Sequence, residues 1–375
     1  MDNMTIFDFM SAEEKEKHGP QKSTDWKWIF SDYPKEKNGL KVFSCFACGG
    51  GSTMGYKLAG CEVIGCCEID SRMNEIYEKN HHPRFNYKMD IREFNKIPNN
   101  ELPEELFNLD ILDGSPPCTT FSMAGLREES WGKKKKFREG QAEQTLDDLS
   151  YIFIETVAKL KPKCVVMENV EGLIKGEAWS YVQMIYEYFY LAGYQVKHWL
   201  LKGETMGVPQ TRHRVFFIAL RNDVDYDLRS LDMSFNYLPI TYGEIKSGEG
   251  KIVNENTECY KWLCLSNEND KRLGDTIVRN GQPEKLFGAK IYWEHNIPQT
   301  LPANGGEEFR GKEKTYISVE DMINTQTFPQ DYDFGERTYN NVKYLCGMSV
   351  PPIMIKRIVN RLVESGIFDT PSQLR

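Results

Sequence analysis

The sequence predicts an α/β fold with a mostly parallel sheet, because strand and helix patterns alternate along the chain after Lys41. Short apolar runs bounded by turn residues indicate buried strands, and apolar residues spaced three and four apart indicate helices. Elements that alternate in this way place helices on both faces of a parallel sheet. Strands are expected at 42–46, 63–67, 109–112, 164–167 and 214–220, with helices from after Ser52 to Leu58 and at 71–80, 149–160 and 353–363.

The segments that follow these strands are polar or rich in glycine and proline, and this pattern indicates where a binding site would lie. The carboxyl ends of parallel strands meet at one edge of a sheet, and ligands bind there. This edge is therefore the candidate site. The loops that should open there are 47–52, 68–70, 113–121 and 168–172.

Composition limits the class of protein. The chain has 375 residues, 40% hydrophobic and 12% aromatic, which is enough for a folded core,. A net charge of −8 argues against a general nucleic-acid binder but allows an enzyme with a local basic face,. With no long apolar run and no signal-peptide pattern, we expect a cytoplasmic protein whose ten cysteines are reduced thiols,.

The chain divides into four segments. Residues 1–39 form an N-terminal extension, in which Trp26, Trp28, Ile29 and Phe30 suggest docking on the body. The α/β pattern covers 40–220, and the polar segment 221–296 indicates a smaller inserted domain. Residues 297–375 would return to the larger domain.

Glycines after the first strand suggest a nucleotide-like ligand that the backbone approaches closely. The spacing does not fit a dinucleotide fingerprint, because Met54 stands where the third glycine belongs,. Glu68, at the end of the second strand, could accept hydrogen bonds from a ribose,. An ordinary acid at a strand end is the alternative interpretation.

Cys118 follows Pro116 and Pro117 at a rigid turn, so its thiol could be a nucleophile, a metal ligand or a packed side chain,. A zinc deaminase pattern fails, because Phe121 replaces the second cysteine and no His-x-Glu occurs,. No metal site is predicted. Glu168 ends a buried strand, where a carboxyl group can act in proton transfer or have a structural role,.

Together these motifs resemble the DNA cytosine-5 methyltransferases of bacterial and phage restriction-modification type, from about Lys41 to Val363. Each block alone is weak, but all of them in this order, around a variable insert, are specific. The resemblance implies a Rossmann-like AdoMet-dependent methyltransferase sheet with a small inserted target-recognition domain. The blocks are Phe46-Ala47-Cys48-Gly49-Gly50-Gly51, Glu68-Ile69-Asp70, Asp90-Ile91, Gly114-Ser115-Pro116-Pro117-Cys118, Glu168-Asn169-Val170, Gln210-Thr211-Arg212-His213-Arg214 and Gly347-Met348-Ser349-Val350.

The resemblance implies methyl transfer from S-adenosyl-L-methionine (AdoMet) to C5 of a flipped-out cytosine in a specific duplex sequence. Cys118 would add to C6, Glu168 would hold N3 and the exocyclic amine, and Arg214 would contact the base, with Arg212 as its partner,. A lid after Cys118 would contact DNA, because between Arg127 and Arg138 six basic residues stand against two acidic ones,. The expected DNA-binding residues are Ser122, Arg127, Lys133, Lys134, Lys135, Lys136 and Gly305.

The cofactor residues implied by the resemblance come from five of the blocks and from one further position, Leu149. Three positions depart from the family pattern around the cofactor: Cys48 replaces a glycine, Ser44 an acid and Met348 an asparagine. None of the three falls on Cys118 or Glu168. The expected cofactor residues are Phe46, Cys48, Gly50, Gly51, Glu68, Ile69, Asp90, Ile91, Pro117, Leu149, Ser349 and Val350.

The family resemblance makes residues 40–220 the AdoMet-binding catalytic domain and 221–296 the target-recognition domain. The expected partner is double-stranded DNA, with neither membrane nor metal; the protein would be a monomer, and a cognate restriction endonuclease would act separately. Three alternatives stay open: a tRNA or other RNA cytosine-5 methyltransferase, a non-catalytic DNA- or AdoMet-binding regulator, and a nicotinamide oxidoreductase. The missing Cys-Phe-Thr tripeptide disfavours the first, and the glycine spacing disfavours the third.

Overall fold

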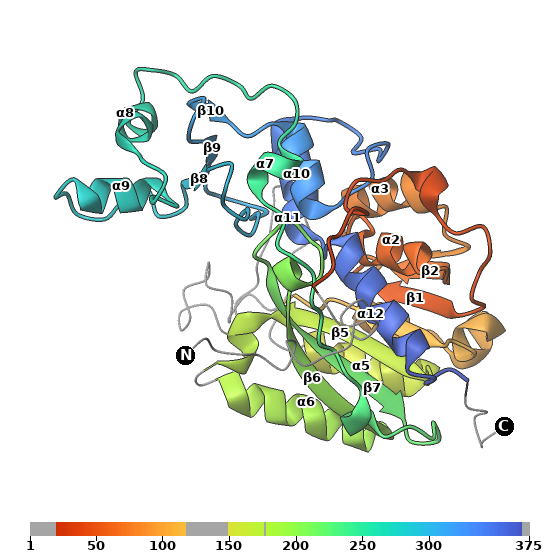
Figure 1. Ribbon diagram of the computed structural model, residues 1–375. Helices are drawn as coiled ribbons and strands as arrows, with labels where there is room; N and C mark the ends of the chain where they lie inside the picture. Colours follow the sequence, from red (N-terminus) through yellow and green to blue (C-terminus); the bar gives the residue numbers. More distant parts are fainter. Residues whose placement is uncertain (1–19, 118–148, 176–177, 370–375) are drawn as a thin grey trace.

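The computed structural model describes residues 20–117, 149–175 and 178–369, and its largest element is a seven-stranded sheet (Figure 1). The strand order is β3-β2-β1-β4-β5-β7-β6. Neighbouring strands pair in parallel from β3 to β5, and β7 is antiparallel to both β5 and β6. The strands are β1 (Lys41–Cys45), β2 (Glu62–Cys67), β3 (Phe85–Tyr87), β4 (Ile111–Gly114), β5 (Cys164–Val170), β6 (Tyr194–Lys202) and β7 (His213–Arg221).

This sheet confirms the predicted α/β class and adds two strands that the sequence pattern did not indicate. β3 has only three residues, all half-buried. β6 is an edge strand whose residues are mostly half-buried, so it lacks the continuous apolar run of a central strand,. Neither β3 nor β6 therefore has an apolar sequence pattern strong enough to predict a strand.

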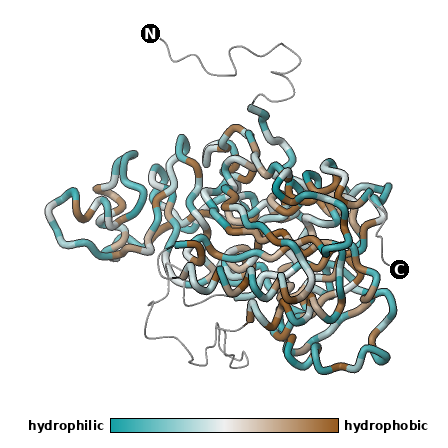
Figure 2. The backbone as a smooth tube through the Cα atoms, turned by 90° about the horizontal axis from the view of Figure 1, so that it is seen from below, coloured by the Kyte–Doolittle hydropathy of each residue, from teal (hydrophilic) through white to brown (hydrophobic). Residues whose placement is uncertain are grey.

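Helices cover both faces of the sheet (Figure 1). Alternate residues of one strand enter different clusters: Val42 packs with one face and Phe43 with the other,. Seen from below, the brown hydrophobic segments concentrate inside this larger body (Figure 2). The helices are α2 (Gly51–Leu58), α3 (Ser71–His81), α4 (Ile91–Lys96), α5 (Leu149–Leu160), α6 (Trp179–Leu191), α7 (Tyr242–Ile245), α10 (Val319–Gln326), α11 (Tyr339–Met348) and α12 (Pro352–Glu364).

A smaller lobe projects from the body with a hydrophobic cluster of its own (Figure 1). It contains a three-stranded sheet in the order β10-β9-β8. Its cluster runs from Val253 to Tyr316, whereas Val224 to Ile245 pack with the large body. A unit defined by its own core thus begins and ends later than 221–296. Its elements are α8 (Glu258–Leu265), α9 (Leu273–Arg279), β8 (Lys290–Tyr292), β9 (Glu308–Arg310) and β10 (Thr315–Tyr316).

The described part of the N-terminal segment packs against the C-terminal part of the chain. Trp28 is buried, and its Nε1 donates a hydrogen bond to the Thr327 carbonyl at 2.8 Å. Asp25 pairs with Lys356 and Arg357 on α12, both at 2.7 Å. Trp26 and Phe30 are half-buried against the same core, so part of the extension docks on the body as expected, whereas Ile29 is exposed.

In the described ranges, no helix has the length and apolar character needed to cross a bilayer.

Candidate active site

The ends of β1, β2, β4 and β5 meet at one edge of the sheet. Register places Cys45 beside Cys67 on one side and beside Gly114 on the other, and Gly114 beside Met167. The polar residues that follow these four strands are therefore neighbours in space. The sequence blocks that are far apart in the chain converge on this edge.

Glu168 and Arg214 form an ion pair there, with 2.8 Å between Glu168 Oε1 and Arg214 Nε. The two side chains are 12% and 16% exposed, so the pair is largely removed from water. β7 brings the arginine into place, because its reversed direction sets Arg214 opposite Val170 at the end of β5. Burial lowers the pKa of Arg214, and Glu168 only partly offsets this effect. Because a guanidinium has a very high pKa, Arg214 is charged beside its acceptor.

Arg212 lies close by and has open hydrogen-bonding capacity. It is 3% exposed, and its Nη2 donates to the Gly347 carbonyl at 3.2 Å. Its Nε and Nη1 are buried and have no hydrogen-bond partner within the described part of the chain. Burial and the nearby Arg214 lower its pKa, and Glu168 raises it. Because unpaired buried donors are costly, these two atoms point to a site built for an acceptor.

The segment that leads to Cys118 is held beside this ion pair. Asn169 Nδ2 donates to the Pro116 carbonyl at 3.3 Å, and Pro117 is half-buried at the end of the described stretch. Seven sequence-predicted residues lie outside the described residues: Cys118, Ser122, Arg127, Lys133, Lys134, Lys135 and Lys136.

Glu68 holds the loop that connects β1 with α2. Its Oε2 accepts from the backbone N–H of Cys48 and its Oε1 from that of Asp70, both at 2.7 Å. Burial raises the pKa of Glu68 to about 7, although both backbone donors oppose the shift. Glu68 as a whole is 8% exposed. It is therefore a buried acceptor at the end of β2, where ribose hydroxyls were expected.

The α11–α12 junction lies directly against this loop. A Cβ atom on Gly51 would stand 2.5 Å from the Val350 carbonyl oxygen and 2.7 Å from Ser349 Cβ, so only glycine fits there. The Ser349 hydroxyl is buried and has no hydrogen-bond partner within the residues described. Gly50 has a left-handed backbone, with φ of +86°. Thus three blocks far apart in sequence form one backbone-lined cradle.

The remaining cofactor candidates flank the same edge. Asp90 caps α4 by accepting from the Arg92 backbone N–H at 2.8 Å, and Ile91 behind it is buried. Ile69 and Phe46 are half-buried, with Phe46 against Phe153 at 6.3 Å between ring centroids. Leu149 begins α5 and is buried. The structure thus brings every described cofactor candidate to the carboxyl edge of the sheet or to the elements that follow it.

Two of the three departures from the family pattern have a structural account. Ser44 lies in register with Asp113 of β4 and donates its hydroxyl to Asp113 Oδ2 at 2.7 Å, while Tyr56 donates to Oδ1 at 3.1 Å. A buried acid is therefore present next to position 44, but it is Asp113 on the neighbouring strand β4. Burial raises the pKa of Asp113 to about 7. Sequence reasoning did not single out Asp113, since only the sheet register shows that it faces Ser44.

Cys48 has a left-handed backbone, with φ of +47°, where the family has a glycine. Such a conformation costs an L-residue about 1–2 kcal/mol. The backbone N–H of Cys48 nevertheless donates to Glu68. The loop therefore makes this backbone contact with a cysteine at the position. We find no structural account of Met348, which ends α11.

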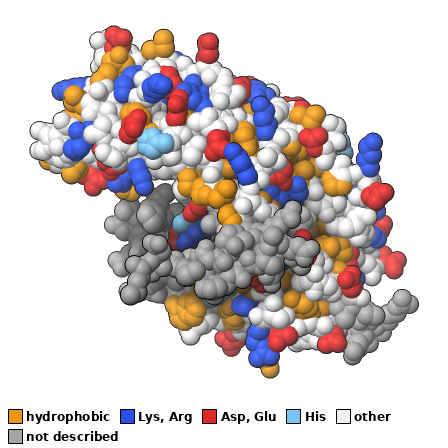
Figure 3. Space-filling view, in the orientation of Figure 1, with side chains coloured by type: hydrophobic (Ala, Val, Ile, Leu, Met, Phe, Trp, Pro, Cys, Tyr) orange, Lys and Arg blue, Asp and Glu red, His pale blue; other side chains and the backbone are white. Residues whose placement is uncertain are grey.

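The small lobe contains basic residues that could contact DNA, but several of them form ion pairs with acidic side chains of the same lobe. Arg272 pairs with Asp275, Arg279 with Asp270, and Lys285 with Glu258. On the visible face of this lobe basic and acidic side chains are interspersed (Figure 3). Gly305 has φ of +67°, and a Cβ there would meet nothing within 4 Å. Its backbone is thus open on the side where a side chain would stand.

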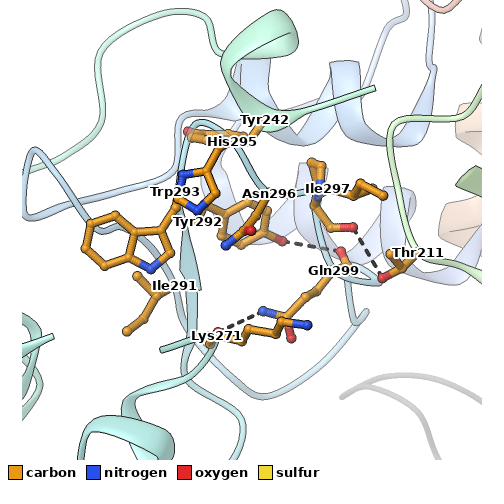
Figure 4. A pocket seen from close by; sticks show the side chains of 11 residues that line it. Thr211, Tyr242, Lys271, Ile291, Tyr292, Trp293, His295, Asn296, Ile297 and Gln299 are labelled. Carbon is orange, nitrogen blue, oxygen red and sulfur yellow. Dashed lines mark hydrogen bonds between the residues drawn. The ribbon is translucent and has the colours of Figure 1, made fainter. Parts of the chain in front are cut away.

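A cavity of about 330 Å³ lies where the small lobe meets the arginine block. Thr211, next to Arg212, lines it together with Lys271, His295, Asn296 and Gln299 (Figure 4). Gln299 Nε2 donates to the Lys271 carbonyl at 2.8 Å, and the Thr211 backbone N–H donates to Pro298 at 2.8 Å. The cavity is therefore a polar junction between the two parts. In the ranges described, no group of three His, Cys, Asp or Glu could hold a metal ion.

Solved structures of methyltransferases share this fold. A mutant of DNMT2 from Spodoptera frugiperda matches with a TM-score of 0.60 at 16% identity, over 87% of this chain and 100% of the other. Dnmt2 methyltransferase from S. pombe matches with a TM-score of 0.55 at 15% identity, over 87% and 99%. The chain therefore has the fold that these solved structures share.

Sequence comparison gives the family. The model for C-5 cytosine-specific DNA methylases matches residues 40–364, so the chain belongs to that family. The type II methyltransferase M.HindV of Haemophilus influenzae is 31% identical over 330 residues, covering 87% of this chain and 97% of the relative. M.FnuDI of Fusobacterium nucleatum is 28% identical over 355 residues, covering 87% and 95%.

Proposed function

We propose that the protein transfers the methyl group of AdoMet to C5 of a flipped-out cytosine in a specific DNA duplex, through a covalent bond between Cys118 and C6. The observation that carries the proposal is the buried Glu168–Arg214 pair beside Arg212, whose Nε and Nη1 have no partner among the described residues. Glu168 and Arg214 can form hydrogen bonds, and Arg212 has these unused donors, so together these side chains could bind the polar edge of a pyrimidine ring,.

The carbon C5 of cytosine is a weak nucleophile, so the ring must first be activated. Attack of the Cys118 thiolate on C6 forms a C–S bond and moves the ring electrons toward N3 and C5. Glu168 supports N3 and the exocyclic amine while this charge develops, and Arg214 orients Glu168 through their ion pair,. After methylation, loss of the C5 proton and breakage of the C–S bond restore the aromatic ring.

The residues around the β1–α2 loop fit AdoMet, which supplies an electrophilic methyl group when bound. Three features support the fit: the Glu68 carboxyl as an acceptor for ribose hydroxyls, the Gly51 backbone that admits no Cβ, and the unpartnered Ser349 hydroxyl within the described chain. Asp90 and Ile91 would frame the adenine. Backbone groups carry much of this site, which explains why it tolerates Cys48.

The target base must leave the duplex to reach such a site, at a cost of about a few kcal/mol. We assign DNA contacts to Ser122, Arg127 and Lys133–Lys136, and sequence reading to the small lobe, with Gly305 close to the duplex. The polar cavity that includes Lys271 and His295 adds groups able to bind base edges or phosphates,. A monomer that acts separately from a cognate endonuclease remains a prediction.

The test is methyl transfer from tritiated AdoMet to mixed-sequence duplex DNA, with base analysis after digestion. We expect tritium in 5-methylcytosine for the wild type and none for Cys118→Ser. RNA of matched sequence in the same assay separates the DNA from the RNA alternative. Incorporation into RNA alone, or equal activity of Cys118→Ser, would contradict the proposal.

A further inference from the structure

The carbonyl oxygen of Gly49, in the middle of the β1–α2 loop, accepts hydrogen bonds from two side chains that are distant in sequence. Tyr332 donates its hydroxyl to this oxygen at 2.5 Å, and His81 donates from Nε2 at 3.1 Å. Both contacts are buried. The loop is thus fixed from behind by α3 and by the segment after α10.

The shape of the loop depends on the His81 ring as well. A Cβ on Gly50 would lie 2.1 Å from His81 Nε2, so the glycine backbone rests on the imidazole. A carbonyl can only accept, so His81 must carry its proton on Nε2. Burial, with Lys57 nearby, lowers the pKa of His81 to about 3, which keeps the ring neutral at physiological pH.

The N-terminal segment supports these two side chains. Phe30 packs on His81 and on Tyr332, with 6.3 Å between ring centroids in each case. The Phe30 backbone N–H donates to Asp331 at 3.0 Å, next to Tyr332 in the chain. Trp28 also accepts, through its carbonyl, from the Gln330 backbone N–H at 2.9 Å. Residues 28–30 therefore fix the segment that carries Tyr332.

We infer that His81 and Tyr332 are positioning residues that set the affinity for AdoMet by holding the Gly49 carbonyl, with Phe30 as their support. The inference rests on the proposed function, since it assumes that this loop binds AdoMet. Neither side chain lies in a motif block, and both act through the backbone. Loosening the loop should weaken cofactor binding and leave the chemical step at saturating AdoMet nearly unchanged.

Five variants test this role, and one of them, Phe30→Ala, removes the supporting ring. Tyr332→Phe removes one hydroxyl, and His81→Leu removes the second donor. His81→Gln keeps an amide donor close to the position of Nε2. Tyr33→Phe is the matched control, because the Tyr33 hydroxyl is buried in the same aromatic group without a hydrogen-bond partner in the described residues.

The measurement is the Kd for S-adenosylhomocysteine by calorimetry without DNA, together with KM for AdoMet and kcat. We expect Tyr332→Phe and His81→Leu each to raise Kd about tenfold, the effect of one buried hydrogen bond. His81→Gln should recover most of the affinity, and Phe30→Ala should fall between wild type and Tyr332→Phe. Tyr33→Phe should match the wild type in Kd, and thermal unfolding shows that each variant folds.

The outcomes separate the two claims. Wild-type binding with Kd unchanged in Tyr332→Phe and His81→Leu would overturn the positioning role and leave the proposed function intact. A tenfold rise in Kd for Tyr33→Phe as well would also overturn it, because that hydroxyl does not touch Gly49. Failure of the wild type to bind S-adenosylhomocysteine would contradict the proposed cofactor itself.

Discussion

The two sides of the candidate active site are built differently. On the side of β5 and β7, charged side chains form the site: Glu168 and Arg214 are paired, and Arg212 has open donors within the described chain. On the side of β1 and β2, backbone groups form much of it, through the amides and carbonyls around Cys48 and Gly49. The family pattern is intact on the first side and altered on the second. The departures from the family pattern therefore fall on the side where backbone groups make more of the contacts.

The largest expected effect is on the charged side. Glu168→Gln keeps the size of the side chain but removes the charge that faces Arg214. We expect the rate of methyl transfer to fall about 10²- to 10⁴-fold, since the group that supports N3 is lost. Single-turnover assays with the proposed DNA substrate measure the effect, and calorimetry with S-adenosylhomocysteine is the control. A rate within threefold of wild type would remove Glu168 from the proposed mechanism.

The second prediction concerns the acid that faces Ser44. Ser44→Asp places two carboxyl groups next to each other in the core, because Ser44 and Asp113 already touch. We expect the variant to lose about 2–4 kcal/mol of unfolding free energy. The double variant Ser44→Asp, Asp113→Ser restores one acid and one hydroxyl and should recover at least half of the loss. Urea unfolding measures the unfolding free energy of the wild type, both single variants and the double variant. If the effects of the two single substitutions simply add up in the double variant, positions 44 and 113 are energetically independent and the prediction is wrong.

The third prediction uses pH. The folded pKa of Glu68 is about 7, above its ordinary value of 4.5, so the folded protein binds the proton more tightly than the unfolded chain. The stabilisation that comes from this group is complete below pH 4.5 and is lost as pH rises through 7. Its slope reaches about 1.4 kcal/mol per pH unit.

Glu68→Gln isolates this contribution, because other titrating groups, such as His81 with its lowered pKa, contribute equally in both proteins. Unfolding free energy of the ligand-free protein is measured between pH 4.5 and 7.5. The variant minus wild-type difference should rise with pH over this range. A flat difference would contradict the raised pKa of Glu68.

The smallest expected effect is on the backbone side. Cys48→Gly relieves the left-handed conformation but removes a partly buried side chain and adds chain entropy to the unfolded state,. We expect the unfolding free energy to change by less than about 1 kcal/mol. Cys48→Val, with a β-branched side chain at the same φ, should be clearly less stable. Equal stability of the two variants would mean that the left-handed backbone at position 48 does not determine their stability.

Much of the fold was predictable because it depends on local pattern. The strands around Phe43 and Val165 are apolar runs with turn residues after them, and they occur where expected. β6 was missed because it is an edge strand, and the reversed direction of β7 has no local signal. The position of Arg214 opposite the end of β5 follows from that reversal.

The candidate site was predictable where it coincides with motifs and not where it depends on distant contacts. Glu68, Glu168 and Arg214 belong to blocks with a family resemblance. Asp113 and Tyr332 contact residues that are 69 and 283 positions away, so only the folded chain brings the partners together. A search for acids in register with Ser44 could have found Asp113 once the strand order was known.

The most direct measurement is covalent trapping. Mixed-sequence duplex DNA in which 5-fluorocytosine replaces cytosine is incubated with the protein and AdoMet, and the product is digested and analysed by mass spectrometry. Fluorine at C5 cannot leave as a proton does, so the bond between the thiol and C6 should persist. We expect a protein–DNA adduct on the peptide that contains Cys118. No adduct, or an adduct on another cysteine, with a protein that binds S-adenosylhomocysteine normally, would contradict it.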